Sequence, residues 1–172
     1  MTQTTLMLVT IGALVNGLLA GGNVDRLLVA TPAWEVVGLN GWADFNRAAD
    51  LGRGQVVYPV MALGTTALTV LAAATAFVGK RRFSRHARLP VGLSAALMLM
   101  ALPFSLKAVP FMQSLRTISN GDAGALGRGF DSAHFWGRFQ GYFHLAAFCC
   151  QLWASVALAR LRGANDQRAS RE

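Results

Sequence analysis

Polar side chains recur at helical spacing in the last apolar stretch of the sequence, and one of them is a histidine. Gln140 and His144 are four residues apart, Gln151 follows seven residues later and Ser155 four after that. These intervals place all four side chains on one face of an α-helix. A neutral imidazole can give or take a proton near physiological pH, so His144 is the first candidate for acid–base chemistry.

Amide side chains in the first apolar stretch are the predicted neighbours of this histidine. Asn16 and Asn23 are seven residues apart and share a helix face. With a rise of about 1.5 Å per residue, Asn16 and His144 fall near the middle of their stretches. We predict a polar chamber with His144 at its floor, or alternatively a structural histidine that hydrogen-bonds another helix. The predicted catalytic residues are His144, Gln140 and Asn16, and the predicted ligand-binding residues are Asn23, Tyr58, Trp136 and Lys107.

A metal or cofactor is not expected at this site. His134 is ten residues from His144, which is about 15 Å along a helix, so the two cannot share a metal. No other stretch supplies a second histidine for a haem, and methionines in such stretches more often serve packing. Cys149 and Cys150 are adjacent, which fits neither a disulfide framework nor a zinc site.

The elements that must position these residues are membrane helices. The chain has 172 residues, 53% of them hydrophobic and 14% charged, and its mean hydropathy is +0.40. A soluble domain carries about 25% charged residues, and about 20 apolar residues cross a bilayer as a helix. We predict an all-α fold, an integral membrane four-helix bundle that forms one domain over residues 1–162. The predicted spans are 6–26, 55–78, 89–109 and 134–159, followed by a polar tail at 163–172.

Two short interfacial helices are predicted in the first loop. Thr31 suits a helix N-cap, Pro32 suits the first helical position, and Gly38 is the predicted end of that helix. A second helix, from Trp42 to Leu51, would place its aromatic side chains on one side, which is typical of a helix lying at a membrane surface. Its alternating charges indicate either a solvated salt-bridge stripe or a charged rim around a pocket.

Charge predicts the orientation in the membrane. The net charge is +8, and five Lys or Arg residues lie between Lys80 and Arg88, with four more after position 159. The positive-inside rule places that turn and both termini in the cytoplasm. We expect a multi-pass protein of the cell membrane, which in a bacterium is the inner membrane. The basic residues flank apolar stretches, and this distribution argues against a nucleic-acid partner.

Aromatic residues gather in the outer half of the predicted bundle, where they form either an interfacial belt or the lining of a cavity. Lys107 likewise either extends to the interface or meets an anionic ligand. Two GxxxG motifs, Gly17 to Gly21 and Gly137 to Gly141, permit close helix crossing and could support an oligomer. The expected partners are therefore the lipid bilayer and a hydrophobic small molecule.

Three segments resemble a known family. They read GALVNGLLAGG in the first span, FNRAADLGRGQVVYPVMALG before and into the second, and WGRFQGYFHLAAF at the start of the fourth. In these segments and in its layout the chain resembles the anthrone oxygenase-like family of small four-span membrane proteins. The resemblance implies oxidation of a polycyclic phenolic ketone by dioxygen without a metal or flavin. His144 would then be the base, and Asn16 and Gln140 would donate hydrogen bonds to the enolate oxygen.

Two classes of function follow from these observations. The first is a cofactor-independent oxygenase-like enzyme that acts on a hydrophobic aromatic small molecule. The alternative is a non-catalytic membrane protein that binds a ligand, assists transport or belongs to an envelope complex. The aligned polar residues favour the enzyme, whereas the absence of a specific catalytic motif favours the alternative.

Overall fold

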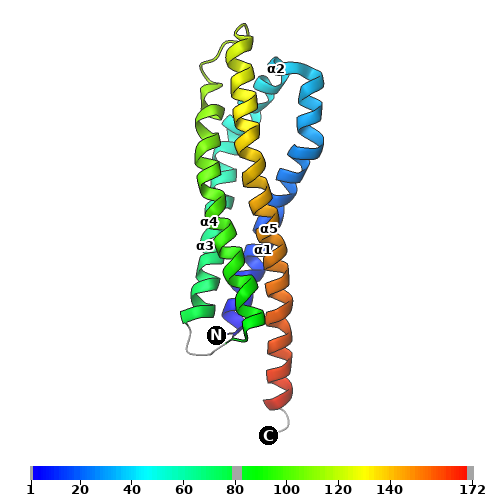
Figure 1. Cartoon of the computed structure of the whole chain (residues 1–172), viewed down its shortest axis with the longest axis vertical. Helices are drawn as coiled ribbons and strands as arrows, with labels where there is room; N and C mark the ends of the chain where they lie inside the picture. Colours follow the sequence, from blue (N-terminus) through cyan, green and yellow to red (C-terminus); the bar gives the residue numbers. More distant parts are fainter. Residues whose placement is uncertain (1, 79–82, 170–172) are drawn as a thin grey trace.

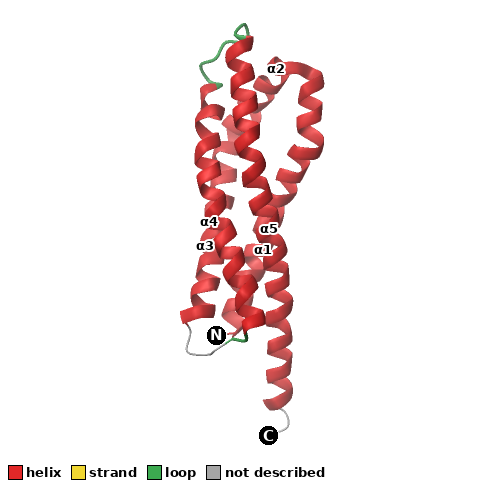
Figure 2. Cartoon of the chain, viewed as in Figure 1, coloured by secondary structure: helices red, strands yellow, loops and turns green. Residues whose placement is uncertain are grey.

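The computed structural model describes residues 2–78 and 83–169, and every regular element in these ranges is helical. This confirms the prediction of an all-α chain (Figures 1 and 2). The elements are α1 (Thr2–Asp25), the π-helical turn η1 (Arg26–Ala30), α2 (Thr31–Ala48), the π-helical turn η2 (Ala49–Gly54), α3 (Gln55–Val78), α4 (Arg85–Ser114) and α5 (Ala123–Ala169).

The helices are long and apolar enough to cross a membrane, which indicates a membrane protein. Within the described residues, three segments qualify by length and composition, namely Gln3–Val78, Arg85–Ser114 and Ala123–Gly163. The predicted count of four membrane helices is not confirmed, because the helical elements from α1 to α3 follow one another directly, across kinks at Gly38 and Gly52, and count as a single segment. That segment contains both of the first two predicted spans.

The first helical run folds back on itself. α1 rises from the lower end of the molecule, α2 lies at the top, and α3 descends beside α1 (Figure 1). Two glycines with non-helical backbone angles lie in the reversal, Gly38 with φ 80° and ψ 172° and Gly52 with ψ −117°. A positive φ costs glycine little, so the helix breaks at Gly38, where the sequence predicted an end.

α5 is much longer than the fourth predicted span. It has 47 residues and runs from a glycine-rich start, which contains Gly124, Gly127 and Gly129, into the polar tail. The glycine-rich start stays helical because it packs against the upper end of the molecule, where Leu126 and Ala133 are buried together with Trp42. The first turn of α1 and the last turn of α5 lie at the same, lower end (Figure 1).

Two apolar clusters fill the interior. The lower cluster consists of Val9, Ala72, Ala76, Phe83, Ala87, Val91, Ala154 and Leu158, and its alanines let the helices approach closely. The upper cluster consists of Trp34, Trp42, Ala43, Leu115, Leu126 and Ala133. Along the sequence, buried polar residues of α1, α3 and α5 lie between the residues of the lower cluster and those of the upper cluster. These polar residues include Asn16 and His144 of the predicted site.

Candidate functional site

His144 lies inside the bundle on α5, and Asn23 of α1 holds its ring. The histidine is only 1% exposed. The amide nitrogen of Asn23 donates to the carbonyl of Leu19 at 2.9 Å and lies 3.4 Å from Nδ1 of His144. An amide nitrogen carries hydrogens and no free lone pair, so Nδ1 is the acceptor. The neutral ring therefore carries its hydrogen on Nε2.

A chain of buried hydrogen bonds joins three helices next to this ring. Nδ2 of Asn16 donates to the backbone carbonyl of His144 and to Oε1 of Gln151, both at 3.1 Å. Nε2 of Gln151 in turn donates to Oγ1 of Thr69 at 2.8 Å. Thr69 passes the chain on to the carbonyl of Thr65 at 2.7 Å. α1, α5 and α3 are thus connected by polar side chains that are almost fully buried.

Two polar atoms of this layer lack partners. Oδ1 of Asn16 is buried and accepts no hydrogen bond. In the described part of the chain, Nε2 of His144 makes no hydrogen bond either, but it is not one of the fully buried unpaired atoms, which are Oδ1 of Asn16 and Nε of Arg88. Buried polar groups in proteins are almost always satisfied, so Oδ1 of Asn16 needs an explanation. One is an acceptor and the other a donor, and an oxygen-bearing molecule could pair with them.

The catalytic residues predicted from the sequence differ in their hydrogen bonding. Both hydrogens of the Asn16 amide are already used, so Asn16 can meet a ligand only through Oδ1, as an acceptor. Gln140 lies one turn before His144 on α5 and is half-buried. Within residues 2–78 and 83–169 it makes no hydrogen bond. The structure thus brings His144 together with Asn16 and Asn23, and it leaves Gln140 beside them unpaired.

The other predicted ligand-binding residues lie apart from His144. Tyr58 is 47% exposed, and its ring centroid is 5.4 Å from the guanidinium carbon of Arg26. Trp136 packs on Phe104, with ring centroids 6.2 Å apart. Lys107 is exposed on α4. Among the described residues, no hydrogen bond, ion pair or ring contact joins Tyr58, Trp136 or Lys107 to the histidine.

Charged groups tie the upper loops to the helices. Arg26 forms an ion pair with the nearly buried Asp50, which links η1 to η2. Arg47 donates to the carbonyls of Leu115 at 2.8 Å and Ile118 at 2.6 Å, and to the side chains of Asp44 and Asn120. Arg47 therefore clamps the segment around Ile118 to α2, and Arg26 with Asp50 clamps η1 to η2. Arg47 and Asp44 also form a partly exposed ion pair three residues apart, as in the predicted salt-bridge stripe.

A second histidine lies in an aromatic cluster that the sequence did not predict. The ring of His134 is 4.0 Å from that of Phe130 and lies edge-on to Trp34 at 5.4 Å. Its Nδ1 donates to the carbonyl of Phe130 at 2.7 Å.

Gln151 takes part in the buried hydrogen bonds next to His144, but the sequence analysis did not assign it to the site. Its spacing of seven from His144 was a usable signal, because it places both side chains on one face.

Comparisons with known proteins add no assignment to this geometry. Among the described residues, no three His, Cys, Asp or Glu side chains are close enough to hold a metal ion. No protein-family model, no curated protein and no solved structure matches the chain significantly.

Proposed function

We propose that the chain is a four-span membrane protein with both termini in the cytoplasm. α1 and α3 have 24 residues each, which is about 36 Å of helix and enough for a hydrocarbon core of about 30 Å. Two crossings within the first helical run would explain why α1 and α3 lie side by side. The basic residues at the lower end support the cytoplasmic assignment.

We further propose that the layer around His144 binds an oxygen-bearing hydrophobic aromatic molecule. The observation that carries this proposal is the unpaired Nε2 of a histidine that is 1% exposed. Asn23 occupies Nδ1, so Nε2–H is free to donate to a carbonyl or phenolate oxygen. Oδ1 of Asn16 could accept a hydrogen bond from a hydroxyl of the same molecule.

The chemistry that fits this arrangement is oxygenase-like, in keeping with the resemblance to anthrone oxygenases. Loss of a C–H proton to water gives an enolate, whose oxygen Nε2–H of His144 stabilises. The enolate carbon adds dioxygen, and the resulting peroxide anion takes a proton back. The hydroperoxide then loses water, so that one CH₂ group and one O₂ become a ketone and H₂O. Dioxygen is the oxidant, and His144 acts as a donor to the oxyanion in place of the base predicted from the sequence.

The test compares two variants of His144 in lipid nanodiscs with an anthrone as the probe. Gln has an amide nitrogen that can reach the position of Nε2, so His144→Gln should keep part of the activity. His144→Leu removes the donor and should lower turnover about 100-fold to 1,000-fold, as the loss of one oxyanion donor does. Oxygen uptake and quinone absorbance are measured, and thermal unfolding confirms that both variants fold. Equal turnover by His144→Leu and the unchanged protein contradicts the proposed role.

A non-catalytic role is the second candidate, and the close packing of the same layer favours it. The hydrogen bonds from Asn16 through Gln151 to Thr69 hold three helices together without needing a ligand. A protein of this kind would take up no oxygen with any anthrone. His144→Leu would then change only stability, and the function would lie in binding, transport assistance or an envelope complex.

A further inference from the structure

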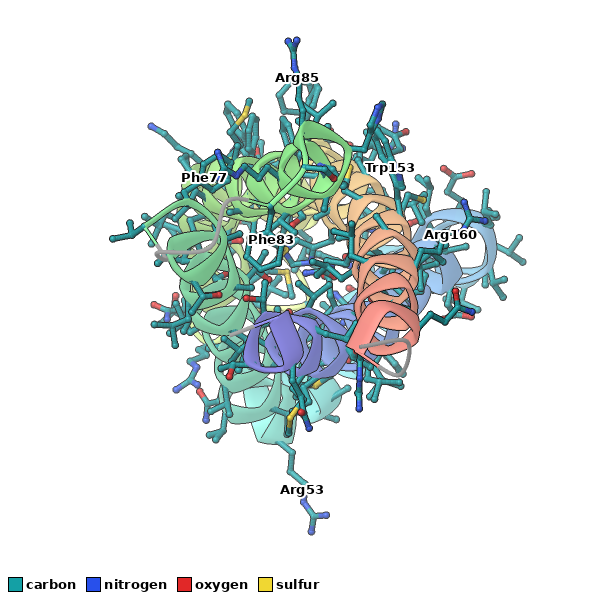
Figure 3. The ribbon with its side chains drawn as sticks, turned by 90° about the horizontal axis from the view of Figure 1, so that it is seen from below. Arg53, Phe77, Phe83, Arg85, Trp153 and Arg160 are labelled. Carbon is teal, nitrogen blue, oxygen red and sulfur yellow. The ribbon has the colours of Figure 1, made fainter. Side chains whose placement is uncertain are left out.

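A groove lies at the lower end of the molecule, far from His144, between the start of α4 and the flank of α5. It measures about 360 Å³ and is lined by Ser84 and His86 at the start of α4 and by Trp153, Val156, Ala157, Arg160 and Leu161 from α5. Viewed from this end, Trp153 and Arg160 lie on the same side of the molecule (Figure 3). The side chain of Arg85, next to the groove, extends away from it.

The groove changes from apolar to cationic along its length. Trp153, Val156 and Arg160 follow one face of α5, since they are three and seven residues apart. Arg160 lies about 10 Å further toward the lower end than Trp153. Trp153 is 47% exposed and Val156 52% exposed, so no part of the described protein covers them. A tryptophan followed by an arginine toward the water is the order found where a helix leaves a membrane.

The local charge selects the kind of ligand. The sequence has no Asp or Glu between residues 51 and 121, and none between 132 and 165. α4 and the part of α5 that forms the groove are therefore free of acids, whereas His86 and Arg160 face it. A guanidinium binds a phosphate with charge-assisted hydrogen bonds in a defined geometry. The volume is near the lower limit of ligand sites, which is about 300 Å³, so it fits a headgroup.

We propose that this groove binds one anionic phospholipid of the leaflet at the lower end. Arg160 holds the lipid phosphate, with His86 and the hydroxyl of Ser84 beside it. The glycerol and the first part of an acyl chain lie along Val156 and Trp153. This proposal requires that the chain lies in a membrane, but it does not depend on the role of His144.

The test is native mass spectrometry of the full chain in a non-ionic detergent. Phosphatidylglycerol and phosphatidylcholine with the same oleoyl chains are titrated separately. We expect one phosphatidylglycerol to bind at least tenfold more tightly than phosphatidylcholine. Arg160→Gln should remove that preference, a loss of about tenfold for one hydrogen-bonded charge. Arg85→Gln removes the same charge at the same end but outside the groove, and it should change the affinity less than twofold.

The outcomes separate a defined site from a generally basic surface. Equal losses in Arg85→Gln and Arg160→Gln, or equal binding of the two lipids, overturn the proposal. Complete displacement of the lipid by the same concentration of inorganic phosphate also overturns it, because the acyl chain would then contribute nothing. The variants count as comparably folded when their thermal unfolding temperatures equal that of the unchanged protein.

Fluorescence provides a second, independent measurement. Trp153 is one of four tryptophans, and the other three lie in α2 and near the start of α5. Phosphatidylglycerol with brominated acyl chains should therefore quench Trp153 preferentially. Trp153→Phe should remove most of the difference between brominated phosphatidylglycerol and brominated phosphatidylcholine. An unchanged difference in Trp153→Phe contradicts the placement of the chain in this groove.

Discussion

Asn16 and Gln151 are 135 positions apart in the sequence, and a 3.1 Å hydrogen bond from Nδ2 to Oε1 joins them in the interior. Gln151 uses its other amide atom to reach Thr69 at 2.8 Å. One side chain of α5 therefore connects α1 with α3. In a membrane interior, where helix contacts gain little from the hydrophobic effect, such bonds help to fix which helices are neighbours.

Replacement of Gln151 by leucine should destabilise the protein by about 1–3 kcal/mol, because two interhelical bonds of about 0.6–1.7 kcal/mol each are lost. The measurement is a denaturant titration in mixed micelles. Gln140→Leu is the matched control on the same helix, since Gln140 has no hydrogen bond within the described residues, and it should change stability by less than about 0.5 kcal/mol. If both variants lose the same stability, the Gln151 bonds do not hold the helices together.

The two glycines of one GxxxG motif should respond differently to alanine. A Cβ added to Gly141 would lie 3.2 Å from Cβ of Asn23, whereas a Cβ added to Gly137 would meet nothing within 4 Å. Gly141→Ala should displace Asn23 from Nδ1 of His144 and lower stability. Gly137→Ala should be neutral or stabilising by up to about 1 kcal/mol, because alanine is the better helix former. Thermal unfolding of both variants checks this, and a larger loss in Gly137→Ala contradicts it.

Helix spacing made part of the site predictable. The polar stripe on α5 and the shared depth of Asn16 and His144 followed from the sequence, because the 3.6-residue period fixes which side chains share a face. Gly38 was predicted as a helix end, and the structure has a positive φ there. Local signals of this kind depend only on residues that are near each other in the chain.

Pairings between helices were not predictable in the same way. Asn16 and Asn23 share a helix face, so the offset of α1 along α5 decides which of them meets the histidine ring, and no local rule fixes that offset. The aromatic cluster around His134 also depends on the glycine-rich segment continuing as helix, which its composition argued against. Separate first and second spans were expected from composition, whereas η1, α2 and η2 fill the whole connection between α1 and α3 with helical turns that are kinked at Gly38 and Gly52.

Arg47→Lys should loosen the segment 115–122 without affecting the membrane interior. The guanidinium contacts two backbone carbonyls and two side chains at once, and an ammonium group cannot reproduce that geometry. Hydrogen exchange measured by mass spectrometry should become at least several-fold faster in this segment and remain unchanged around His144. Arg53→Lys is the control, because Arg53 is an exposed arginine of the same loop (Figure 3). Faster exchange in both variants would show that the clamp is not specific to Arg47.

Cysteine labelling distinguishes four crossings from three. Cys149 and Cys150 are free, so both are first replaced by serine, and single cysteines are then placed at exposed positions. Four crossings put Asn40 and Thr117 outside, where an impermeant maleimide reaches them in intact cells, and Ser84 inside, where it requires permeabilised membranes. Thr4 and Gly163 should both behave like Ser84, because an even number of crossings returns the chain to its starting side. Three crossings would place Thr4 and Gly163 on opposite sides, and labelling of only one of them in intact cells contradicts the proposed topology.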